Sequence, residues 1–296
     1  MTLGQLRTFV EVARAGSVGG AAAALFVTEP SVSAAVASLR REIGVALVER
    51  DGRGIRLTPA GEELARYAEQ IVGLSSQAVR AAREAGGGPG HLRLVGVTTA
   101  GEYVLPPLLA EFRRRYPQVQ VSLEVGNRAT VIGRLVAREA DLAVGGRPPA
   151  ESQISGEAFL DNPLVIVARA DHPLSTRRSI AATAIAGETW LLREPGSGTR
   201  ETTEELWARK GIAPASVMTV GSNGAIKQAA AVGLGVTLMS KHAVSAELES
   251  GLLVLLRVKG TPLRRSWYAL HLDRTPIPRS AQLFLDLLRS RAPVPT

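Results

Sequence analysis

Residues 29–44, EPSVSAAVASLRREIG, decide how the first part of this chain folds. Four apolar residues recur there at helical spacing and predict a buried stripe: Val32, Val36, Leu39 and Ile43. The opposite stripe carries short, nearly uncharged side chains where a solvated helix usually carries Glu and Lys: Ser31, Ala34, Ser38 and Arg41. We therefore predict an amphipathic helix whose outer face is small enough to approach another surface closely.

Helical signals also precede this segment, and a hairpin signal follows it. Apolar residues at i, i+3, i+4 and i+7 predict a helix that ends near Gly16, and Ser17 starts a short Ala-rich helix to about Leu25. Pro30 suits the opening of the quoted helix, and residues 47–58 have two apolar arms around a Gly-rich turn. Two short helices, a tight turn and a hairpin are typical of a winged helix-turn-helix.

A recognition helix lies deep in the major groove of DNA, where long acidic side chains on its outer face would clash or repel phosphate. Hydroxyl groups there can contact base edges and phosphates, and the arginines can contact the DNA backbone, those of the hairpin acting as a wing. The predicted DNA-binding residues are Thr28, Glu29, Pro30, Ser31, Ser33, Ala34, Ser38, Arg40, Arg41, Arg50, Arg53 and Arg56. The alternative is that this face packs on another protein surface.

Residues 59–85 continue as a helix of about seven turns. An approximate heptad seam predicts pairing with a second copy, although a plain amphipathic linker helix is the alternative: Leu64, Ala68, Ile71, Ser75, Ala78 and Ala82. The stretch GGGPG at 86–90 breaks all periodicity and marks the domain boundary.

Beyond residue 90, strand and helix patterns alternate, which predicts a parallel sheet covered on both faces. Two crossing strands near residues 165 and 265 would divide this part into two α/β lobes. The predicted domains are a DNA-binding domain at 1–58, a linker at 59–90 and an effector-binding domain at 91–296. Lobe I takes 91–165 and 266–296, and lobe II takes 166–265.

Three helix starts in this second part are rich in Gly, Ser and Thr, at 98–101, 196–199 and 222–224. Free N–H groups make such starts anion sites, and in a two-lobed fold they can converge on one ligand. Arg193 and two further arginines lie near the same loops and can pair with a carboxylate or phosphate. The predicted effector-binding residues are Thr98, Thr99, Arg147, Ser197, Gly198, Thr199, Arg200 and Asn223. The alternative is that each start is an ordinary N-cap.

Composition excludes several classes of function. The chain has no cysteine, and its four histidines lie far apart, so we expect no metal site, no cofactor and no Cys or His catalysis. No apolar run is long enough to span a bilayer, and charged residues near the N-terminus argue against an export signal. The net charge of +8 lies almost entirely beyond residue 90 and suits an anionic small ligand as well as nucleic acid. An enzyme or a solute-binding protein of similar fold is the alternative function.

The stretch from residue 21 to 64 resembles the signature of LysR-type transcriptional regulators. The matching positions are Ala21, Ala22, Leu25, Thr28, Pro30, Ser33, Leu39, Ile43, Gly44, Leu47, Arg50, Leu57, Thr58 and Gly61. Glu29 stands where the family usually has a base-contacting Gln, and Val48 where it has Phe. An acid at position 29 can accept from cytosine or cap the helix start.

The stretches SLEVGNR, GRPP, REPGSGTR and GSNGAIKQAAAVGLGV are similar to the effector domain of CbbR-type regulators of carbon-fixation operons. The resemblance implies a periplasmic-binding-protein-like, two-lobed effector domain and an anionic effector such as a sugar phosphate, phosphoglycolate or NADPH. It also implies a cytoplasmic transcription regulator that binds double-stranded promoter DNA as a homodimer or homotetramer. We therefore expect a DNA-binding protein, and no enzyme, that responds to a phosphorylated or carboxylated metabolite.

Overall fold

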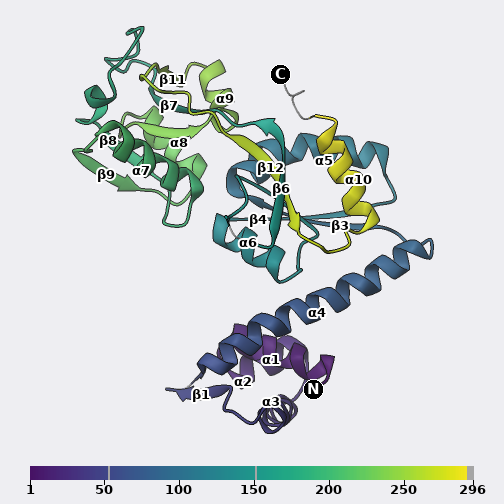
Figure 1. Ribbon diagram of the computed structural model, residues 1–296. Coiled ribbons are helices and arrows are strands. Elements are labelled where there is room, and N and C mark those ends of the chain that lie inside the picture. Colours follow the sequence, from purple (N-terminus) through teal and green to yellow (C-terminus); the bar gives the residue numbers. More distant parts are fainter. Residues whose placement is uncertain (53, 151, 292–296) are drawn as a thin grey trace. The chain divides into compact units, whose positions relative to one another are not determined.

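The computed structural model describes residues 1–52, 54–150 and 152–291 and divides into two compact units. The main boundary falls between Gly88 and Pro89, and each unit has its own hydrophobic core (Figure 1). The first unit contains, in order, α1 (Leu3–Ala15), α2 (Val18–Leu25), α3 (Glu29–Ile43), β1 (Val48–Asp51), β2 (Gly54–Leu57) and α4 (Pro59–Ala85).

Local side-chain chemistry sets the ends of the first three helices. Thr2 caps α1 in a reciprocal capping box with Gln5, and Gly16 ends that helix in the left-handed region at φ 60°. Ser17 caps α2 by accepting from a backbone N–H of its first turn, and Gly44 ends α3 at φ 84°. The predicted helix-turn-helix and hairpin are both present.

The first unit's core excludes the last turn of α3. Val32 and Leu39 are fully buried and Val36 is half-buried, but Ile43 is 40% exposed. The prediction that Ile43 is buried was therefore wrong, because α3 extends beyond the core before Gly44 ends it. The core consists of Leu6, Phe9, Val10, Leu39, Leu47, Ala65 and Ala68.

Helix α4 also differs from its predicted seam. Ala68 is fully buried in the core of the first unit, and Leu64 packs against the same cluster. These two residues are therefore not available to a second copy. The exposed apolar positions with heptad-like 4-3-4 spacing are instead Tyr67, Ile71, Leu74 and Ala78.

The second unit consists of two lobes. Lobe I contains β3 (His91–Val97), the π-helical turn η1 (Ala100–Val104), α5 (Leu105–Arg115), β4 (Gln120–Gly126), α6 (Arg128–Val136), β5 (Leu142–Gly145), β6 (Ile154–Asp161), β12 (Ser266–Leu272) and α10 (Arg279–Arg289). Lobe II contains β7 (Leu164–Arg169), the 3-10 turn η2 (Ala182–Ile185), β8 (Thr189–Leu192), α7 (Gly198–Lys210), β9 (Ser216–Thr219), α8 (Asn223–Ala231), β10 (Thr237–Ser240), α9 (Lys241–Glu249) and β11 (Leu253–Leu256).

The sheets are mixed, whereas the sequence predicted parallel ones. Lobe I has the strand order β4-β3-β5-β12-β6, in which β3 is parallel to β4 and β5, while β12 is antiparallel to β5 and β6. Helices α5 and α10 lie side by side, with Phe112 and Phe284 in edge-to-face contact at 5.2 Å (Figure 1). Lobe II has an antiparallel β10-β7-β11 sheet and a parallel β8-β9 pair. The sequence prediction missed β6, α9 and β11.

Two crossing segments join the lobes and are hydrogen-bonded to each other. The Asn162 N–H donates to the Arg265 carbonyl at 2.7 Å, and Leu164 and Leu263 exchange two backbone bonds of 3.0 and 2.9 Å. These segments place residues 162–164 and 263–267 at the junction of the lobes. Within the described ranges, no single helix is long and apolar enough to cross a membrane, and α2 with α3 meets that test only as a pair bent by 111°.

Candidate functional site

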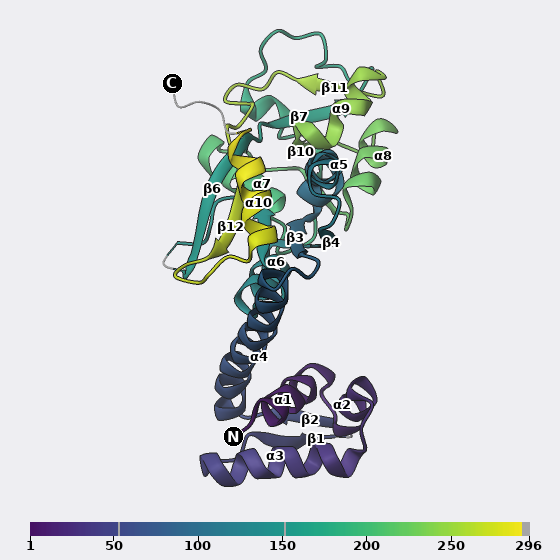
Figure 2. The same ribbon diagram turned by 90° about the vertical axis from the view of Figure 1, so that its right-hand side faces the viewer.

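The predicted recognition face of α3 is open to solvent in the described structure. Pro30, Ser31, Ser33 and Ala34 are all exposed, while Val32 between them is fully buried. Figure 2 shows α3 along one edge of the first unit, with the hairpin of β1 and β2 beside it. The small face is therefore not used to pack this chain's own core.

Two of the hydroxyl groups on α3 already have partners. Ser38 is half-buried and accepts a 2.9 Å hydrogen bond from the Gln5 side chain, so it is turned toward α1. The Thr28 and Ser31 hydroxyls lie 2.9 Å apart at the helix start, and both are exposed. Ser33 is thus the predicted hydroxyl that is exposed and has no hydrogen bond among the described residues.

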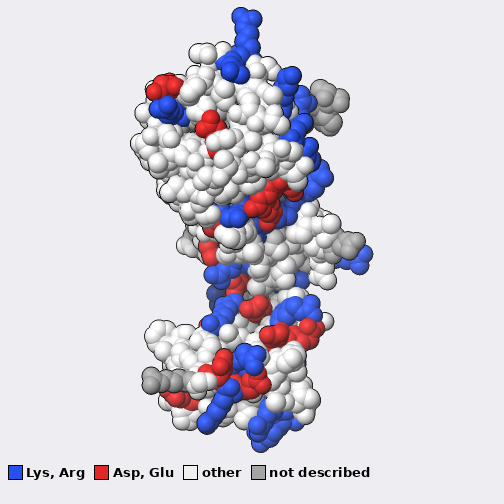
Figure 3. All heavy atoms as spheres, turned by 90° about the vertical axis from the view of Figure 1, so that its left-hand side faces the viewer, with Lys and Arg blue, Asp and Glu red and all other residues white. Residues whose placement is uncertain are grey.

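The predicted arginines occupy two places around this face. Arg40 and Arg41 are exposed in the last turn of α3, and Arg50 is exposed on β1. Arg56 on β2 pairs with Glu49 across the hairpin, while Arg53 lies outside the described residues. Arg side chains on the first unit alternate with Asp and Glu side chains in Figure 3, so the positive charge of this unit is local.

Glu29 lies close to one of two glycines in α2 that are unfavourable by helix propensity. Its side chain lies over α2, where a Cβ at Gly19 would be 3.0 Å from a Glu29 carboxylate oxygen. A Cβ at Gly20 would lie 2.8 Å from the Ser17 hydroxyl that caps the same helix. Gly at these positions in a helix costs roughly 1 kcal/mol each. The contact with the Ser17 cap accounts for Gly20, whereas the flexible Glu29 side chain can move aside for a Cβ at Gly19.

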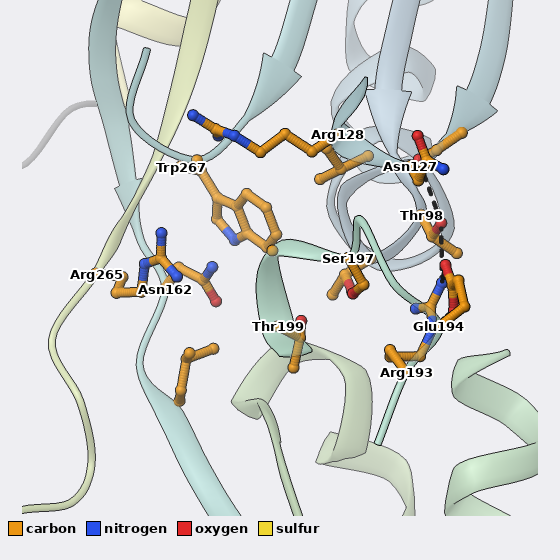
Figure 4. A pocket seen from close by; sticks show the side chains of 16 residues that line it. Thr98, Asn127, Arg128, Asn162, Arg193, Glu194, Ser197, Thr199, Arg265 and Trp267 are labelled. Atoms are coloured by element: carbon orange, nitrogen blue, oxygen red, sulfur yellow. Dashed lines mark hydrogen bonds and ion pairs between the residues drawn. The ribbon is translucent and has the colours of Figure 1, made fainter. Parts of the chain in front are cut away.

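A cavity of about 70 Å³ lies between the two lobes of the second unit, and we call it the interlobe cavity. Its lining comes from the ends of β3, β4 and β5, the start of α7 and both crossing segments (Figure 4). The polar residues that line it, with one tryptophan, are Thr98, Thr99, Asn127, Arg128, Asn162, Arg193, Glu194, Ser197, Thr199, Arg265 and Trp267.

Two of the three predicted helix starts meet at this cavity. Ser197 is the N-cap of α7, and Ser197, Gly198 and Thr199 all line the cavity. Thr98 faces them from lobe I, where its hydroxyl donates to the Gly126 carbonyl at 3.3 Å. The unpaired N–H groups at the start of α7 can therefore bind an anion here.

The third helix start serves a different purpose. Asn223 is 2% exposed and does not line the cavity. Its amide donates to the Thr99 hydroxyl at 3.2 Å and to Glu102 at 3.0 Å, both in lobe I. Asn223 therefore bridges the lobes beside the cavity instead of facing into it.

Of the three arginines near these loops, only Arg193 lines the cavity. Arg193 is buried, and its guanidinium donates to the Glu194 carboxylate at 2.7 and 2.8 Å and to the Asn223 Oδ1 atom at 2.6 Å. Burial opposes ionisation of Glu194, but the Arg193 hydrogen bonds, a backbone hydrogen bond and the Arg193 charge together hold the pKa of that carboxyl below its usual range. Arg200 turns to Glu204 at 2.8 Å, and neither it nor the exposed Arg147 lines the cavity.

The sequence prediction missed the residues on the crossing-segment side of the cavity. The Oδ1 atom of Asn162 and the Nε1 atom of Trp267 are buried without a hydrogen-bond partner among the described residues. Arg128 and Arg265 have no ion pair in the described part of the chain, and burial lowers the pKa of the Arg265 guanidinium. The positions of Asn162, Arg265 and Trp267 beside the predicted crossings at 165 and 265 were the one available signal, and Arg128 at the start of α6 had none.

The residues that the structure describes contain no cluster of His, Asp and Glu that could hold a metal ion. A helix-turn-helix unit, joined to a two-lobed domain with a cation-lined cavity, defines a ligand-responsive DNA-binding regulator. Two family models match this chain: the bacterial regulatory helix-turn-helix protein of the lysR family over residues 3–62, and the LysR substrate binding domain over residues 85–293. The chain therefore belongs to the LysR family of transcriptional regulators.

Its relatives include regulators of carbon-fixation genes. The chain is 38% identical to the HTH-type transcriptional activator CmpR of Synechocystis, over 97% of this chain and 94% of that protein. It is 37% identical to the RuBisCO operon transcriptional regulator of Allochromatium vinosum, over 99% and 97%. The regulatory domain of Synechocystis CcmR in complex with 2-PG is 40% identical, with a TM-score of 0.65, and covers 68% of this chain and 96% of that domain.

These comparisons confirm the predicted LysR-type resemblance, its CbbR-like subgroup and the fold class. The relatives are named as transcriptional regulators and activators. The alternatives, an enzyme or a solute-binding protein, are therefore not favoured.

Proposed function

We propose that this regulator controls carbon-fixation genes from the cytoplasm and responds to a compact phosphorylated or carboxylated metabolite in its interlobe cavity. Support for the gene class comes from the RuBisCO operon relative, and support for the ligand class comes from the CcmR domain solved with 2-PG. Thr98, Thr99, Ser197, Gly198 and Thr199 are the predicted residues that line this cavity. They would hold the anion together with the α7 N-terminus.

The unpartnered Nε1 atom of Trp267 carries the ligand proposal, because an indole N–H donates to an anion, whereas the unpartnered Asn162 Oδ1 atom only accepts and needs a donor. A buried polar atom without a partner costs about 1–3 kcal/mol, so native proteins rarely keep two in one place unless something binds there. Trp267 Nε1 can only donate, and a phosphate or carboxylate oxygen can accept from it. Arg128 and Arg265 supply positive charge on the same side (Figure 4).

The size of the cavity limits the ligand in this state of the lobes. Its volume of about 70 Å³ favours a ligand of few non-hydrogen atoms over a dinucleotide. Isothermal titration calorimetry of the full chain with 2-PG should show one saturable site per chain. Glycolate, which lacks the phosphate, should bind at least about tenfold more weakly because it forms fewer charge-assisted hydrogen bonds. Absence of saturable binding by 2-PG and by other small phosphorylated acids would exclude the cavity as an anion site.

For DNA, we propose that the open face of α3 reads base edges and that Arg40, Arg41 and Arg50 contact phosphates. The Ser33→Glu substitution places a carboxylate on that face, where it would meet phosphates and base acceptors. We expect at least about a hundredfold loss of affinity for the promoter fragment in a gel-shift titration. The unchanged circular dichroism spectrum of the variant would show that the fold persists.

Ser33→Ala is the matched control for this test, because it removes the hydroxyl without adding charge. It should keep most of the non-specific affinity and lose only part of the promoter preference. Promoter affinity in Ser33→Glu that equals the parent's would mean that another surface binds the DNA.

We further propose that α4 joins two copies through its exposed stripe of Tyr67, Ile71, Leu74 and Ala78, and that dimers associate into tetramers. The 4-3-4 spacing of the stripe fits helix pairing, and three of its side chains are large and apolar. Leu74→Glu should shift the protein toward monomer in analytical ultracentrifugation. Glu62→Lys, on the opposite side of α4, is the control, and a dimer that survives Leu74→Glu would place the contact elsewhere.

Ligand and DNA binding would be coupled through the lobes. A ligand that binds one arrangement of the lobes more tightly shifts the population toward it, and this changes the spacing of the DNA-binding units in an oligomer. Promoter affinity measured with and without 2-PG should therefore differ, and an identical affinity and DNase I footprint would argue against this coupling.

A further inference from the structure

A second, much larger hollow lies beside the interlobe cavity. It has a volume of about 1000 Å³ and lies between α7 and the two crossing segments, and we call it the α7 groove. Its charged lining residues are Arg147, Arg209, Arg264, Arg265, Asp161 and Glu205. Of these, Arg265 also lines the interlobe cavity.

The four arginines of the α7 groove lack carboxylate partners. No ion pair within 4.0 Å joins any of them to an acid among the described residues. Asp161 and Glu205 leave two positive charges in excess, so the groove is cationic as a whole. Arginines elsewhere in the second unit, such as Arg93 and Arg289, do pair with acids.

Arg265 distinguishes this groove from a patch of solvated surface arginines. It is only partly exposed, and its guanidinium donates to the Thr202 hydroxyl of α7, which holds it in place. Burial lowers its pKa, the opposing charge of Glu205 only partly offsets this, and Arg128 and Arg147 add repulsion. A bound anion would relieve that repulsion, because it adds negative charge to the part that Glu205 and Glu201 supply.

The geometry also indicates what kind of anion fits. The guanidinium groups come from three elements: the loop after β5, helix α7 and the second crossing segment. Planar guanidiniums bind phosphate oxygens in pairs, and several around one hollow suit a ligand with more than one anionic group. Leu263 and Tyr268 add an apolar wall that can hold the carbon part of a metabolite.

We propose that the α7 groove is a second anion-binding site, which takes a phosphorylated metabolite larger than the ligand of the interlobe cavity. Because Arg209 and Arg264 line only the groove, this site can be tested without altering the cavity. The proposal does not depend on the identity of the cavity ligand.

Inorganic pyrophosphate is a suitable probe, titrated into the full-length parent and two double variants by calorimetry at constant ionic strength. Arg209→Gln with Arg264→Gln removes two guanidiniums from the groove. Arg113→Gln with Arg114→Gln removes the same charge from exposed residues at the end of α5. We expect saturable binding to the parent, at least about a tenfold loss in the groove variant, and less than about a twofold change in the control.

Three outcomes would overturn the proposal. The parent could show no saturable binding, the control could lose as much affinity as the groove variant, or binding could be insensitive to the groove substitutions. In the last case a Thr199→Ala variant would lose the pyrophosphate affinity instead, which would place the probe in the interlobe cavity. Because 2-PG binding is measured separately, failure of the groove leaves the test of the cavity intact.

Discussion

Polar side chains line both sides of the interlobe cavity, but they are hydrogen-bonded within the chain on one side, whereas two of them keep an unpartnered atom on the other. On one side, the buried Arg193 and Asn223 and the partly exposed Glu194 form a network in which each group has a partner from the chain itself. On the other side, Asn162 and Trp267 each keep a buried polar atom without a partner. Both sides line or adjoin the same space, and Figure 4 shows Arg193 and Arg265 on opposite sides of it.

The difference separates polar groups that the chain itself satisfies from polar groups that it leaves without a partner. The Arg193 side also bonds Thr98 and, through Asn223, Thr99, so its hydrogen bonds hold lobe II to lobe I. A network whose polar groups are all hydrogen-bonded has few donors or acceptors left for a ligand. A network with unpartnered polar groups is stabilised when a ligand bonds to them. We therefore expect substitutions on the two sides to affect different properties.

The largest expected effect is on stability, from Arg193→Leu. This change leaves Glu194 without its cation and the Asn223 carbonyl without its donor in a buried setting. Because Glu194 is partly exposed, we expect the lower end of the usual cost, about 3 kcal/mol of unfolding free energy. Urea unfolding measures it, with Arg178→Leu, at an exposed position of lobe II, as the control. A loss equal to that of the control would show that the network does not hold the lobes together.

Asn162→Leu should affect ligand affinity and leave stability nearly unchanged. The substitution replaces a buried, unpartnered amide oxygen by an apolar group of similar size, so the unfolding free energy should change by less than about 1 kcal/mol. Affinity for 2-PG should nevertheless fall about tenfold, because the anion loses the N–H groups of the Asn162 amide as donors. Calorimetry and urea unfolding on the same preparation separate the two quantities. A variant that binds as well as the parent would show that Asn162 does not contact the ligand.

The smallest effect is expected from Thr199→Ala. This residue lies in the first turn of α7, where the backbone N–H groups remain available to an anion after the hydroxyl is removed. We expect a threefold to fivefold (about 1 kcal/mol) loss of 2-PG affinity and no change in DNA affinity of the ligand-free protein. A loss as large as that of Asn162→Leu would mean that the hydroxyl, and not the backbone, dominates at this end.

Much of the fold could be predicted because it depends on local patterns. The stripe of Val32 and Leu39, the caps at Ser17 and Thr58 and the breaks at Gly16 and Gly44 act over a few residues. The strand β6 escaped prediction because its burial alternates irregularly, and its direction is set by pairing with β12, which follows it by more than 100 residues.

The candidate site could be predicted only in part. Gly-, Ser- and Thr-rich helix starts revealed Ser197 and Thr199, because an N-cap has a recognisable composition. Nothing in the sequence distinguishes them from Asn223, whose amide is used up by lobe I. Heptad spacing likewise predicted α4 as a pairing helix, but the predicted seam included Ala68, which is buried in the first unit's own core.

The sequence by itself determined the family, the two kinds of domain and the elements that carry function, since caps, periodicity and a long family signature are local in the chain. Tertiary structure alone decided which polar groups are satisfied. Asn162, Arg193 and Trp267 acquire or lack partners from segments distant in sequence, and hydrogen-bond satisfaction depends on positions in space. That is why the protein's binding chemistry had to be read from the folded chain.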